Sequence, residues 1–337
     1  MTDLFFFNEL KKKPIVSNYY SVDSELFDNN GRCNFEFRKQ DGLICIFKES
    51  ESFFKQMFFF LSKEKLNEKM YFFNNEDYIV SEIVFSELHK SQDDLISNWF
   101  LINENFHYKT FMRMFKVSKH ENNDADFSRV VTPSHEDIYE IHKKIHDNFD
   151  VLSERIPTVQ ELFALMNSTY IIKENDEIAS VLISEIKGKT EELRYWLVLP
   201  KYRNLGYGNL LMKYFLNLNK ETIRYTLWVD VTNLNAIRKY EINGFIRDKL
   251  INKIFINNRI MKNKIVEILK ETRPEFEFEE NINFIDAGYL DSFDLITIVA
   301  DLENTFGVKI NGALMVPENF QNIDSIMNLV QASKNAS

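Results

Sequence analysis

The chain has 337 residues and a formal net charge of −10, which allows two or three domains and argues against nucleic acid as the main partner. Its two cysteines, Cys33 and Cys45, are too few for a disulfide framework, so we expect a cytoplasmic protein. The sequence shows neither a secretory signal nor an apolar run near the ~20 residues of a membrane span, so we expect no membrane association.

Residues 1–125 predict a mixed α/β domain. Apolar runs typical of strands occur at 33–37, 42–47 and 78–85, and a pattern typical of a helix covers 51–61. The Asn- and Asp-rich stretch 120–124 predicts a linker, so we place the first domain border at 125.

Two histidines, His142 and His146, stand four residues apart on a predicted helix. This spacing places both rings on one face of the helix, where they can in principle contribute to a zinc site. No Cys or acidic residue at ligand spacing accompanies them. We therefore expect a solvated helix face or the lining of an acceptor site, and no metal.

A strand, a glycine turn and a helix follow one another between 192 and 218. The apolar run 192–199 predicts the strand, the turn contains Gly206 and Gly208, and the helix carries Leu210, Leu211 and Phe215. Glycines let a backbone approach a ligand, successive N–H groups point at it, and the helix dipole favours negative charge. The segment is therefore suited to hold a pyrophosphate, although Arg-x-x-Gly-x-Gly alone is a weak signal.

A second strand and helix strengthen this interpretation. The strand is predicted at 223–231, and the helix has Asn233 seven residues before Tyr240, Ala236 four before it, and Gly244-Phe245 directly after the next turn. Together with the loop from Arg203, this segment resembles the GNAT acyltransferase superfamily. The resemblance implies an α+β fold over 126–258 that transfers an acyl group, most often to an amine.

The resemblance also implies roles for individual residues. In the family, the loop amides grip the diphosphate of coenzyme A, and the pantetheine arm pairs with the splayed strand before the loop. Tyr240 takes the position of the tyrosine that protonates the departing thiolate. The positions that the resemblance assigns to coenzyme A are Leu197, Val198, Leu199, Arg203, Asn204, Leu205, Gly206, Tyr207, Gly208, Asn233 and Ala236.

Acyl transfer to an amine also needs an oxyanion donor and a general base. The backbone amide of Val198 or Leu199 suits the oxyanion, since the family splays its strands there. Glu191 and Glu192, at the beginning of the same strand, are the nearest carboxylates and the candidates for the base. A solvated strand end explains the two glutamates equally well, and the sequence leaves both interpretations open.

The N-terminal region contains a fainter version of the same pattern. The stretch 99–115 parallels 239–254: each has an amphipathic helix, a turn with Asn and Phe, and an alternating strand, and Phe106 and Phe245 are 139 residues apart. We therefore expect two tandem GNAT-like units with mixed central sheets. The N-terminal copy of the pattern has no Arg-x-x-Gly-x-Gly loop, so we expect this copy to bind no coenzyme A. We expect it instead to complete the sheet, shape the acceptor pocket or dock a partner.

The C-terminal region centres on Ser292, which opens an amphipathic helix with an apolar stripe through Leu295, Ile298 and Leu302. A serine in such a place is usually an N-cap. However, the segments 286–292 and 301–310 resemble an acyl carrier protein, with further helices readable at 262–271 and 323–334. The resemblance implies a four-helix bundle over 261–337 that carries phosphopantetheine on Ser292. Phe293 departs from the more usual Leu but keeps the position apolar.

These features predict an acyltransferase that moves an acyl group from a coenzyme A or carrier thioester to a small-molecule amine. Its fused carrier would present donor or acceptor, in natural-product or glycan-modification biosynthesis. A phosphopantetheinyl transferase and an acyl- or aminoacyl-loading enzyme are the expected partners. Two alternatives remain: a loading enzyme that acylates its own carrier, or a carrier with a non-catalytic GNAT docking scaffold. The intact spacing from Arg203 to Phe245 favours an enzyme.

Overall fold

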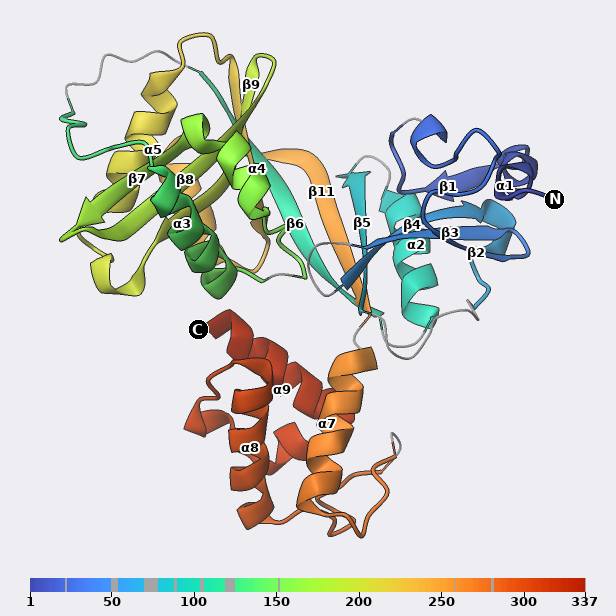
Figure 1. Ribbon diagram of the computed structural model, residues 1–337. Coiled ribbons are helices and arrows are strands. Elements are labelled where there is room, and N and C mark those ends of the chain that lie inside the picture. The colour runs from blue at the N-terminus through green and yellow to red at the C-terminus, as the bar shows by residue number, and fades with distance from the viewer. Residues whose placement is uncertain are drawn as a thin grey trace. The chain divides into compact units, whose positions relative to one another are not determined.

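The computed structural model describes residues 1–21, 23–49, 54–69, 78–87, 90–103, 106–118, 125–150, 152–257, 259–279 and 282–336 (Figure 1). The predicted linker at 120–124 lies outside these residues. The chain divides into two compact units, one comprising Met1–Tyr71 and Ile79–Ile256, and a second that takes in the chain from Asn257 on.

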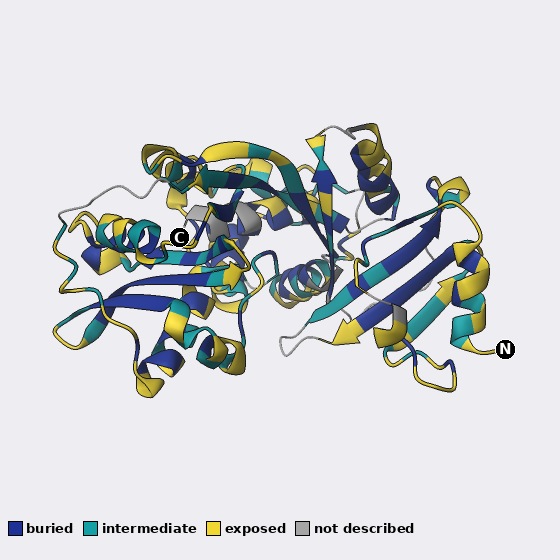
Figure 2. Cartoon of the chain, turned by 90° about the horizontal axis from the view of Figure 1, so that it is seen from above, coloured by how far each residue is buried: buried dark blue, intermediate teal, exposed yellow. Residues whose placement is uncertain are grey.

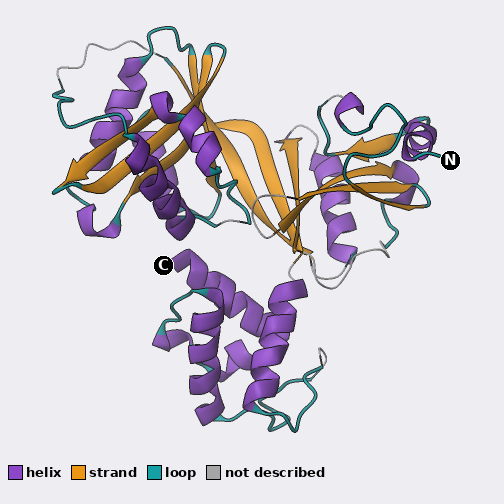
Figure 3. Ribbon diagram, viewed as in Figure 1, coloured by secondary structure: helices purple, strands orange, loops and turns teal. Residues whose placement is uncertain are grey.

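In the described residues, the first unit is built on one sheet of 11 strands in the order β2-β3-β4-β5-β11-β6-β10-β9-β8-β7, with β1 paired to β4 outside this path (Figure 3). The sheet runs across the expected border at 125, so residues 1–125 and 126–258 share it. The strands are β1 (Ile15–Ser17), β2 (Glu36–Gln40), β3 (Leu43–Glu49), β4 (Phe54–Ser62), β5 (Tyr78–Ser86), β6 (Phe106–Val117), β7 (Thr169–Glu174), β8 (Glu177–Lys187), β9 (Thr190–Val198), β10 (Arg224–Asp230) and β11 (Ile246–Asn257).

The two halves of this unit exchange their last strands. β11, which ends the second half, pairs antiparallel with β5 of the first half, and Ser81 lies opposite Phe255. β6, which ends the first half, pairs antiparallel with β10 of the second half, and Phe111 lies opposite Asp230. Figure 1 shows β6 and β11 as the two long strands between the halves. Each half therefore completes the sheet of the other.

Helices cover both faces of the sheet. In the second half, α5 and α6 pack on one face through Leu211, Phe215 and Ile237, and α3 and α4 pack on the opposite face through Ile141 and Leu162. The strands between them are mostly buried (Figure 2). The helices of the unit are α1 (Asp3–Lys11), α2 (Lys90–Ile102), α3 (His135–Asn148), α4 (Val159–Ala164), α5 (Tyr207–Leu218) and α6 (Leu234–Ile242), with 3-10 turns η1 (Asp23–Glu25), η2 (Lys63–Lys65), η4 (Met166–Ser168) and η5 (Pro200–Tyr202).

Local chemistry fixes several of these boundaries. Ser134 begins α3 with a capping box in which its hydroxyl accepts from the Asp137 amide and the Asp137 carboxylate accepts from the Ser134 amide. Asn175 and Asp176 join β7 to β8 with φ angles of 50° and 65°, the left-handed conformation that a tight hairpin requires at both central residues. Asn and Asp tolerate this conformation better than most residues do.

The helix expected at 51–61 is wrong. Residues 54–62 form β4, while 51–53 lie outside the described residues. β4 lies between β3 and β5, and its residues Met57, Phe59 and Phe60 are almost completely buried. A central strand that is covered on both faces has a nearly continuous apolar run, and a run of this kind resembles a buried helix in the sequence.

The second unit is a small helical bundle. Its α-helices are α7 (Arg259–Thr272), α8 (Ser292–Phe306) and α9 (Ile323–Ala336), and they share one apolar core that includes Ile265, Ile298 and Ile326. Two 3-10 segments, η6 (Gly312–Leu314) and η7 (Pro317–Phe320), occupy the connection where a third helix of a four-helix bundle is expected. Phe320 of η7 is completely buried, so this short turn still supplies a side chain to the core.

Among the described residues, no helix is both long enough and apolar enough to cross a bilayer. Cys33 and Cys45 are free, and Cys45 is buried. Burial raises the pKa of the Cys45 thiol, which keeps it in the unreactive protonated form.

Candidate active site

A gap opens between the parallel strands β9 and β10. Their register runs from Thr190 opposite Arg224 to Leu193 opposite Leu227 and ends there, although both strands continue. At the same level, the pairing of β9 with β8 shifts, because Ser184 lies opposite Leu193 and Ile183 lies opposite Tyr195. Arg194 is thus the extra residue of a β-bulge, which bends the strand and ends its pairing with β10.

The backbone of β9 beyond the bulge has amides directed at this gap. The Leu199 amide donates to the Ala179 carbonyl at 3.0 Å, so it faces β8. Because alternate residues of a strand direct their amides to opposite edges, the Val198 amide faces the gap. Of the two amides proposed for the oxyanion, only that of Val198 points to the place where a ligand can lie. Leu197 also faces β8, where its carbonyl accepts from the Ser180 hydroxyl.

The loop after β9 leads into an uncapped helix. Asn204 and Gly206 adopt left-handed φ angles of 67° and 84°, which turn the backbone sharply before α5. Gly206 is the N-cap of α5, and no side chain bonds the first-turn amides there. Arg203, Asn204, Leu205 and Gly206 are exposed. Unbonded N–H groups and the positive end of the helix dipole at such a helix start can bind an anion such as a phosphate group.

Two tyrosines fix this loop to the β7–β8 hairpin. The Tyr202 hydroxyl donates to Glu177 at 2.6 Å, and the Tyr207 hydroxyl donates to Glu174 at 2.6 Å. Arg129 forms an ion pair with Glu174 and lies over the Tyr207 ring, 4.9 Å from its centroid. Tyr207 is therefore buried and fixes the start of α5 to the β7–β8 hairpin.

Gly208 has a different role from Gly206. A Cβ on Gly208 would stand 2.8 Å from the Val198 side chain and 3.3 Å from Trp196, whereas a Cβ on Gly206 would meet nothing within 4 Å. A side chain at 208 would therefore collide with β9 itself. Gly208 allows α5 to pack closely against the strand, and Trp196 donates to the Gly208 carbonyl at 3.1 Å.

Tyr240 lies beside Trp196, whose ring centroid is 5.5 Å from that of Tyr240. Tyr240 belongs to α6, which begins at the N-cap Asn233, where the side-chain oxygen accepts from the Ala236 amide at 3.0 Å. The structure gives the Tyr240 hydroxyl no hydrogen-bond partner among the described residues. Burial, and then the charge of Glu154, raises the pKa of Tyr240 above its ordinary value, so the phenol keeps its proton at neutral pH.

Glu154 lies within electrostatic reach of Tyr240, and no sequence motif marks it among the 51 acidic residues. It follows α3, and its carboxyl is partly buried. Burial, together with the charges of Asp150 and Asp230, raises the pKa of Glu154 to about 7, while Lys109 acts in the opposite direction. A carboxyl with a pKa near 7 is suited to accept a proton at neutral pH.

Glu191 and Glu192 lie at the paired end of β9, before the bulge. Glu191 is 1% exposed, and its two oxygens accept from Ser184 at 2.7 Å and from Thr222 at 3.0 Å. Burial raises the pKa of Glu191, and these two hydrogen bonds oppose the shift. Glu192 pairs with Lys187 at 3.1 Å. Neither glutamate is brought together with Tyr240.

His142 and His146 lie on α3 with ring centroids 6.5 Å apart. His142 is partly buried and His146 is exposed. Within the part of the chain that the structure describes, no group of three or more His, Cys, Asp or Glu side chains is placed to hold a metal ion.

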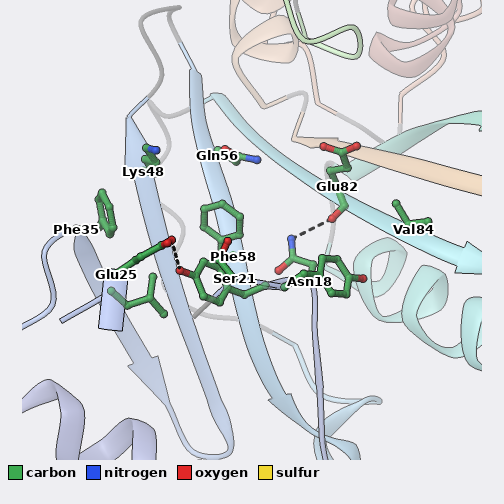
Figure 4. A pocket seen from close by; sticks show the side chains of 12 residues that line it. Asn18, Ser21, Glu25, Phe35, Lys48, Gln56, Phe58, Glu82 and Val84 are labelled. Atoms are coloured by element: carbon green, nitrogen blue, oxygen red, sulfur yellow. Dashed lines mark hydrogen bonds between the residues drawn. The ribbon is translucent and has the colours of Figure 1, made fainter. Parts of the chain in front are cut away.

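In the N-terminal half, other strands of the same half pair with both edges of β4. β3 pairs with one edge of β4, and β1 pairs with the last residues of its other edge, Phe60–Ser62. Asn18 follows β1 and donates to Met57 in β4 at 3.0 Å and to Ser81 in β5 at 3.0 Å. Figure 4 shows a further hydrogen bond of Asn18, to the Glu82 carbonyl at 3.2 Å. Asn18 also accepts from the Phe59 amide at 2.8 Å. A cleft of about 390 Å³ remains beside Asn18.

Ser292 occupies the first turn of α8 and is exposed. The cap is its neighbour Asp291, whose carboxylate accepts from the Phe293 amide at 2.8 Å and the Asp294 amide at 3.1 Å. Ser292 is therefore not the N-cap, and the structure gives its hydroxyl no partner among the described residues. Phe293 is 82% exposed, so the departure from Leu leaves the core unaffected.

Arg273, which directly follows α7, supports this helix start. Its guanidinium donates to both oxygens of Asp294 at 2.9 Å and to Asp291 at 2.8 Å. The two backbone hydrogen bonds lower the pKa of Asp291, and the charge of Arg273 adds to this effect. The loop before Ser292 thus has a fixed shape, with the hydroxyl directed to solvent.

Two family models match the chain at these sites. The model of the acetyltransferase (GNAT) family matches residues 135–245, and the model of the phosphopantetheine attachment site matches residues 259–331. The chain therefore combines a GNAT acetyltransferase domain with a phosphopantetheine-attachment domain. It is an acyltransferase with a fused carrier, and the carrier domain implies covalent phosphopantetheine and a phosphopantetheinyl transferase that installs it.

Two of the solved structures that this chain is similar to are named as GCN5-related N-acetyltransferases, and both are similar only at low identity. A GCN5-related N-acetyltransferase from Sphaerobacter thermophilus is 10% identical, with 68% of this chain and 78% of that chain covered and a TM-score of 0.45. A GCN5-related N-acetyltransferase from Kribbella flavida is 12% identical, with 66% and 89% covered and a TM-score of 0.42. No curated protein matches the sequence.

Proposed function

We propose that the β9–β10 gap transfers an acyl group from a coenzyme A or carrier thioester to an amine. The observation that carries this proposal is the gap itself, which opens at Arg194 between an uncapped helix start at Gly206 and the phenol of Tyr240. Bound coenzyme A would supply the activated acyl group. The amides of the first turn of α5 fit its diphosphate, and the free edge of β9 fits its amide-containing arm.

Three groups of the chain would share the chemistry. The Val198 amide donates to the carbonyl oxygen as negative charge develops on it. Glu154 accepts the proton that the amine loses when its nitrogen bonds to the carbonyl carbon. Tyr240 donates a proton to the sulfur as the carbon–sulfur bond breaks. Glu191 is less suited to the role of base, because both its oxygens already accept hydrogen bonds.

The fused carrier brings a second thioester to the same chemistry. Phosphopantetheine on Ser292 has the same arm as coenzyme A, so one gap can accept both. Because the carrier and the gap belong to one chain, we expect the carrier to encounter the gap at an effective concentration of roughly millimolar. The carrier therefore presents the acyl donor or the amine acceptor, loaded by a separate enzyme, in the cytoplasmic biosynthesis of a natural product or a modified glycan.

Two other functions remain distinguishable. A loading enzyme would move the acyl group from coenzyme A to its own carrier thiol, and a docking scaffold would transfer nothing. The loop before α5 leaves its first-turn amides without a cap, and Tyr202 and Tyr207 fix it to the β7–β8 hairpin. This arrangement favours an enzyme over a docking scaffold, because a scaffold does not need a fixed loop with unbonded amides. In the N-terminal half, β4 is paired on both edges and bonded by Asn18, which supports a single coenzyme A site per chain. We propose that this half is a GNAT-like unit that completes the sheet.

Intact-mass analysis tests the proposal. The phosphopantetheinylated chain is incubated with a panel of acyl-CoAs, with and without a panel of primary amines, beside the Ser292→Ala and Tyr240→Phe variants. N-acyl transfer predicts an acylated amine product that Tyr240→Phe suppresses. An acyl mass that accumulates on the wild-type chain and is absent from Ser292→Ala would establish the loading enzyme. If neither product forms with any donor, the scaffold replaces our proposal.

A further inference from the structure

Asp150 organises the turn that carries Glu154. Its carboxylate accepts from the Leu152 amide at 3.0 Å and from the Ser153 hydroxyl at 3.0 Å. The Glu154 amide donates to the Asp150 carbonyl at 2.8 Å. An aspartate that bonds its own chain two and three residues on fixes a turn, so the position of Glu154 depends on Asp150.

The cation that holds Asp150 comes from the other half of the unit. Lys109 lies on β6, two residues before Phe111, which pairs with Asp230 at the end of β10. Its ammonium is 2.7 Å from the Asp150 carboxylate, and the two side chains are only 22% and 23% exposed. A pair shielded in this way is screened less by solvent than a surface ion pair.

Two further contacts place the turn across the gap. Leu152 packs in a cluster with Trp228 of β10. The Arg155 carbonyl accepts from the hydroxyl of Tyr195 in β9. Trp228 and Tyr195 lie on the two strands that separate, so the turn is fixed next to both strands at the level of the gap.

We propose that Lys109 is a positioning residue for acyl transfer: it holds the turn that presents Glu154 to the gap and supplies the positive charge that balances the carboxylates around it. The inference rests on the proposed role of Glu154 as the base. It assigns the N-terminal half a direct influence on the chemistry of the second half, through a strand that the two halves exchange.

The charges that act on Glu154 come from every side of the turn. Asp150 beside it and Asp230 at the end of β10 raise its pKa, and Lys109 on β6 lowers it. Glu154 in turn raises the pKa of Tyr240 on α6 and of Tyr195 on β9. Removal of Lys109 must therefore raise the pKa of Glu154, and neutralisation of Asp150 must lower it.

The test measures the ionisation of Glu154 directly, by ¹³C NMR titration of side-chain carboxyls in the full chain, with Glu154→Gln to assign the resonance. Lys109→Met should raise the pKa of Glu154 by about half a unit or more. Asp150→Asn should lower it by a similar amount, and Lys109→Arg should leave it close to the wild-type value. A general loss of structure would not shift the pKa of Glu154 in opposite directions in the Lys109→Met and Asp150→Asn variants.

The pH dependence of kcat/KM for acetyl-CoA and an accepted amine is measured on the same variants. The acidic part of this pH profile, where kcat/KM rises with pH, should shift in the same direction as the NMR pKa of Glu154 in each variant. If the NMR pKa moves and the rate profile does not, Glu154 is not the base, and the proposed catalytic role fails while the electrostatic coupling stands. If Lys109→Met shifts the pKa by less than about 0.2 unit, or both variants shift it in one direction, the inference is overturned.

Discussion

Gly208 and Val198 are in such close contact that a Cβ on the glycine would stand 2.8 Å from Val198 Cγ2. Gly208→Val should therefore destabilise the first unit by about 1–3 kcal/mol, because position 208 is buried and the added side chain would collide with Val198 and Trp196. Thermal unfolding measures the loss of stability.

Gly206→Ala is the matched variant, because a Cβ at this position would meet no atom within 4 Å. The φ angle of 84° at residue 206 is strained for alanine, so the loop should change shape while the packing of α5 on β9 is retained. Coenzyme A binding, measured by calorimetry, should therefore weaken. Equal coenzyme A affinity in wild type and Gly206→Ala would remove the loop from the binding site.

Ser292→Ala should abolish the addition of phosphopantetheine by a phosphopantetheinyl transferase and leave the stability of the carrier unit unchanged. The reason is that Asp291, not Ser292, caps α8. Asp291→Ala should instead lower the melting temperature of that unit by roughly 5 °C. Intact mass and thermal unfolding report the two effects separately. Labelling that persists in Ser292→Ala would refute the attachment site.

Tyr240→Phe should reduce turnover by about 10²-fold or more and leave acyl-CoA affinity nearly unchanged, since a proton donor to the leaving sulfur acts mainly in the transition state. Tyr214→Phe, on α5 in the same apolar cluster, is the control and should retain activity. Steady-state kinetics and calorimetry separate turnover from affinity. Full activity in Tyr240→Phe would mean that the proton comes from another source.

The rate should rise with pH up to about 7 and then level, because Glu154 must lose its proton to act as the base and burial raises its pKa to about 7. Tyr240 must keep its proton, and its raised pKa ensures this throughout the neutral range. Glu154→Gln should lose most activity at low pH and recover as the free amine becomes abundant. Glu191→Gln and Glu192→Gln are measured beside it, and the candidate whose replacement gives this pattern is the base.

Asn18→Ala should destabilise the first unit by about 1–3 kcal/mol, because it leaves the buried Phe59 amide without its side-chain acceptor, while the Met57 carbonyl still accepts from the Ser81 hydroxyl. Asn8→Ala, at an exposed position of α1, is the control and should change stability by less than about 0.5 kcal/mol. Denaturant unfolding measures both variants. If Asn18→Ala lowers the free energy of unfolding no more than the control does, the packing of the N-terminal half does not depend on this side chain.

Much of the site was predictable because its signals are local. The strands at 192–199 and 223–231, the glycine turn at Gly206 and the helix after Ser292 all follow from residues next to one another in the chain. The features that the sequence did not reveal depend on long-range contacts. Asn18 bonds Ser81 across 63 residues. Glu154 becomes a candidate base only because the fold places it within electrostatic reach of Asp230 and Tyr240.

The exchanged strands have a consequence for biosynthesis. Ser81 pairs with Phe255, which lies 174 residues later, so β5 has no β11 beside it until almost the whole transferase has been translated. At roughly 5–20 residues per second, the nascent N-terminal half waits for about 10–35 s with an unpaired strand edge. During that interval the exposed edge is open to association with other nascent chains, and a chaperone that shields hydrophobic segments at the ribosome would raise the yield of folded enzyme.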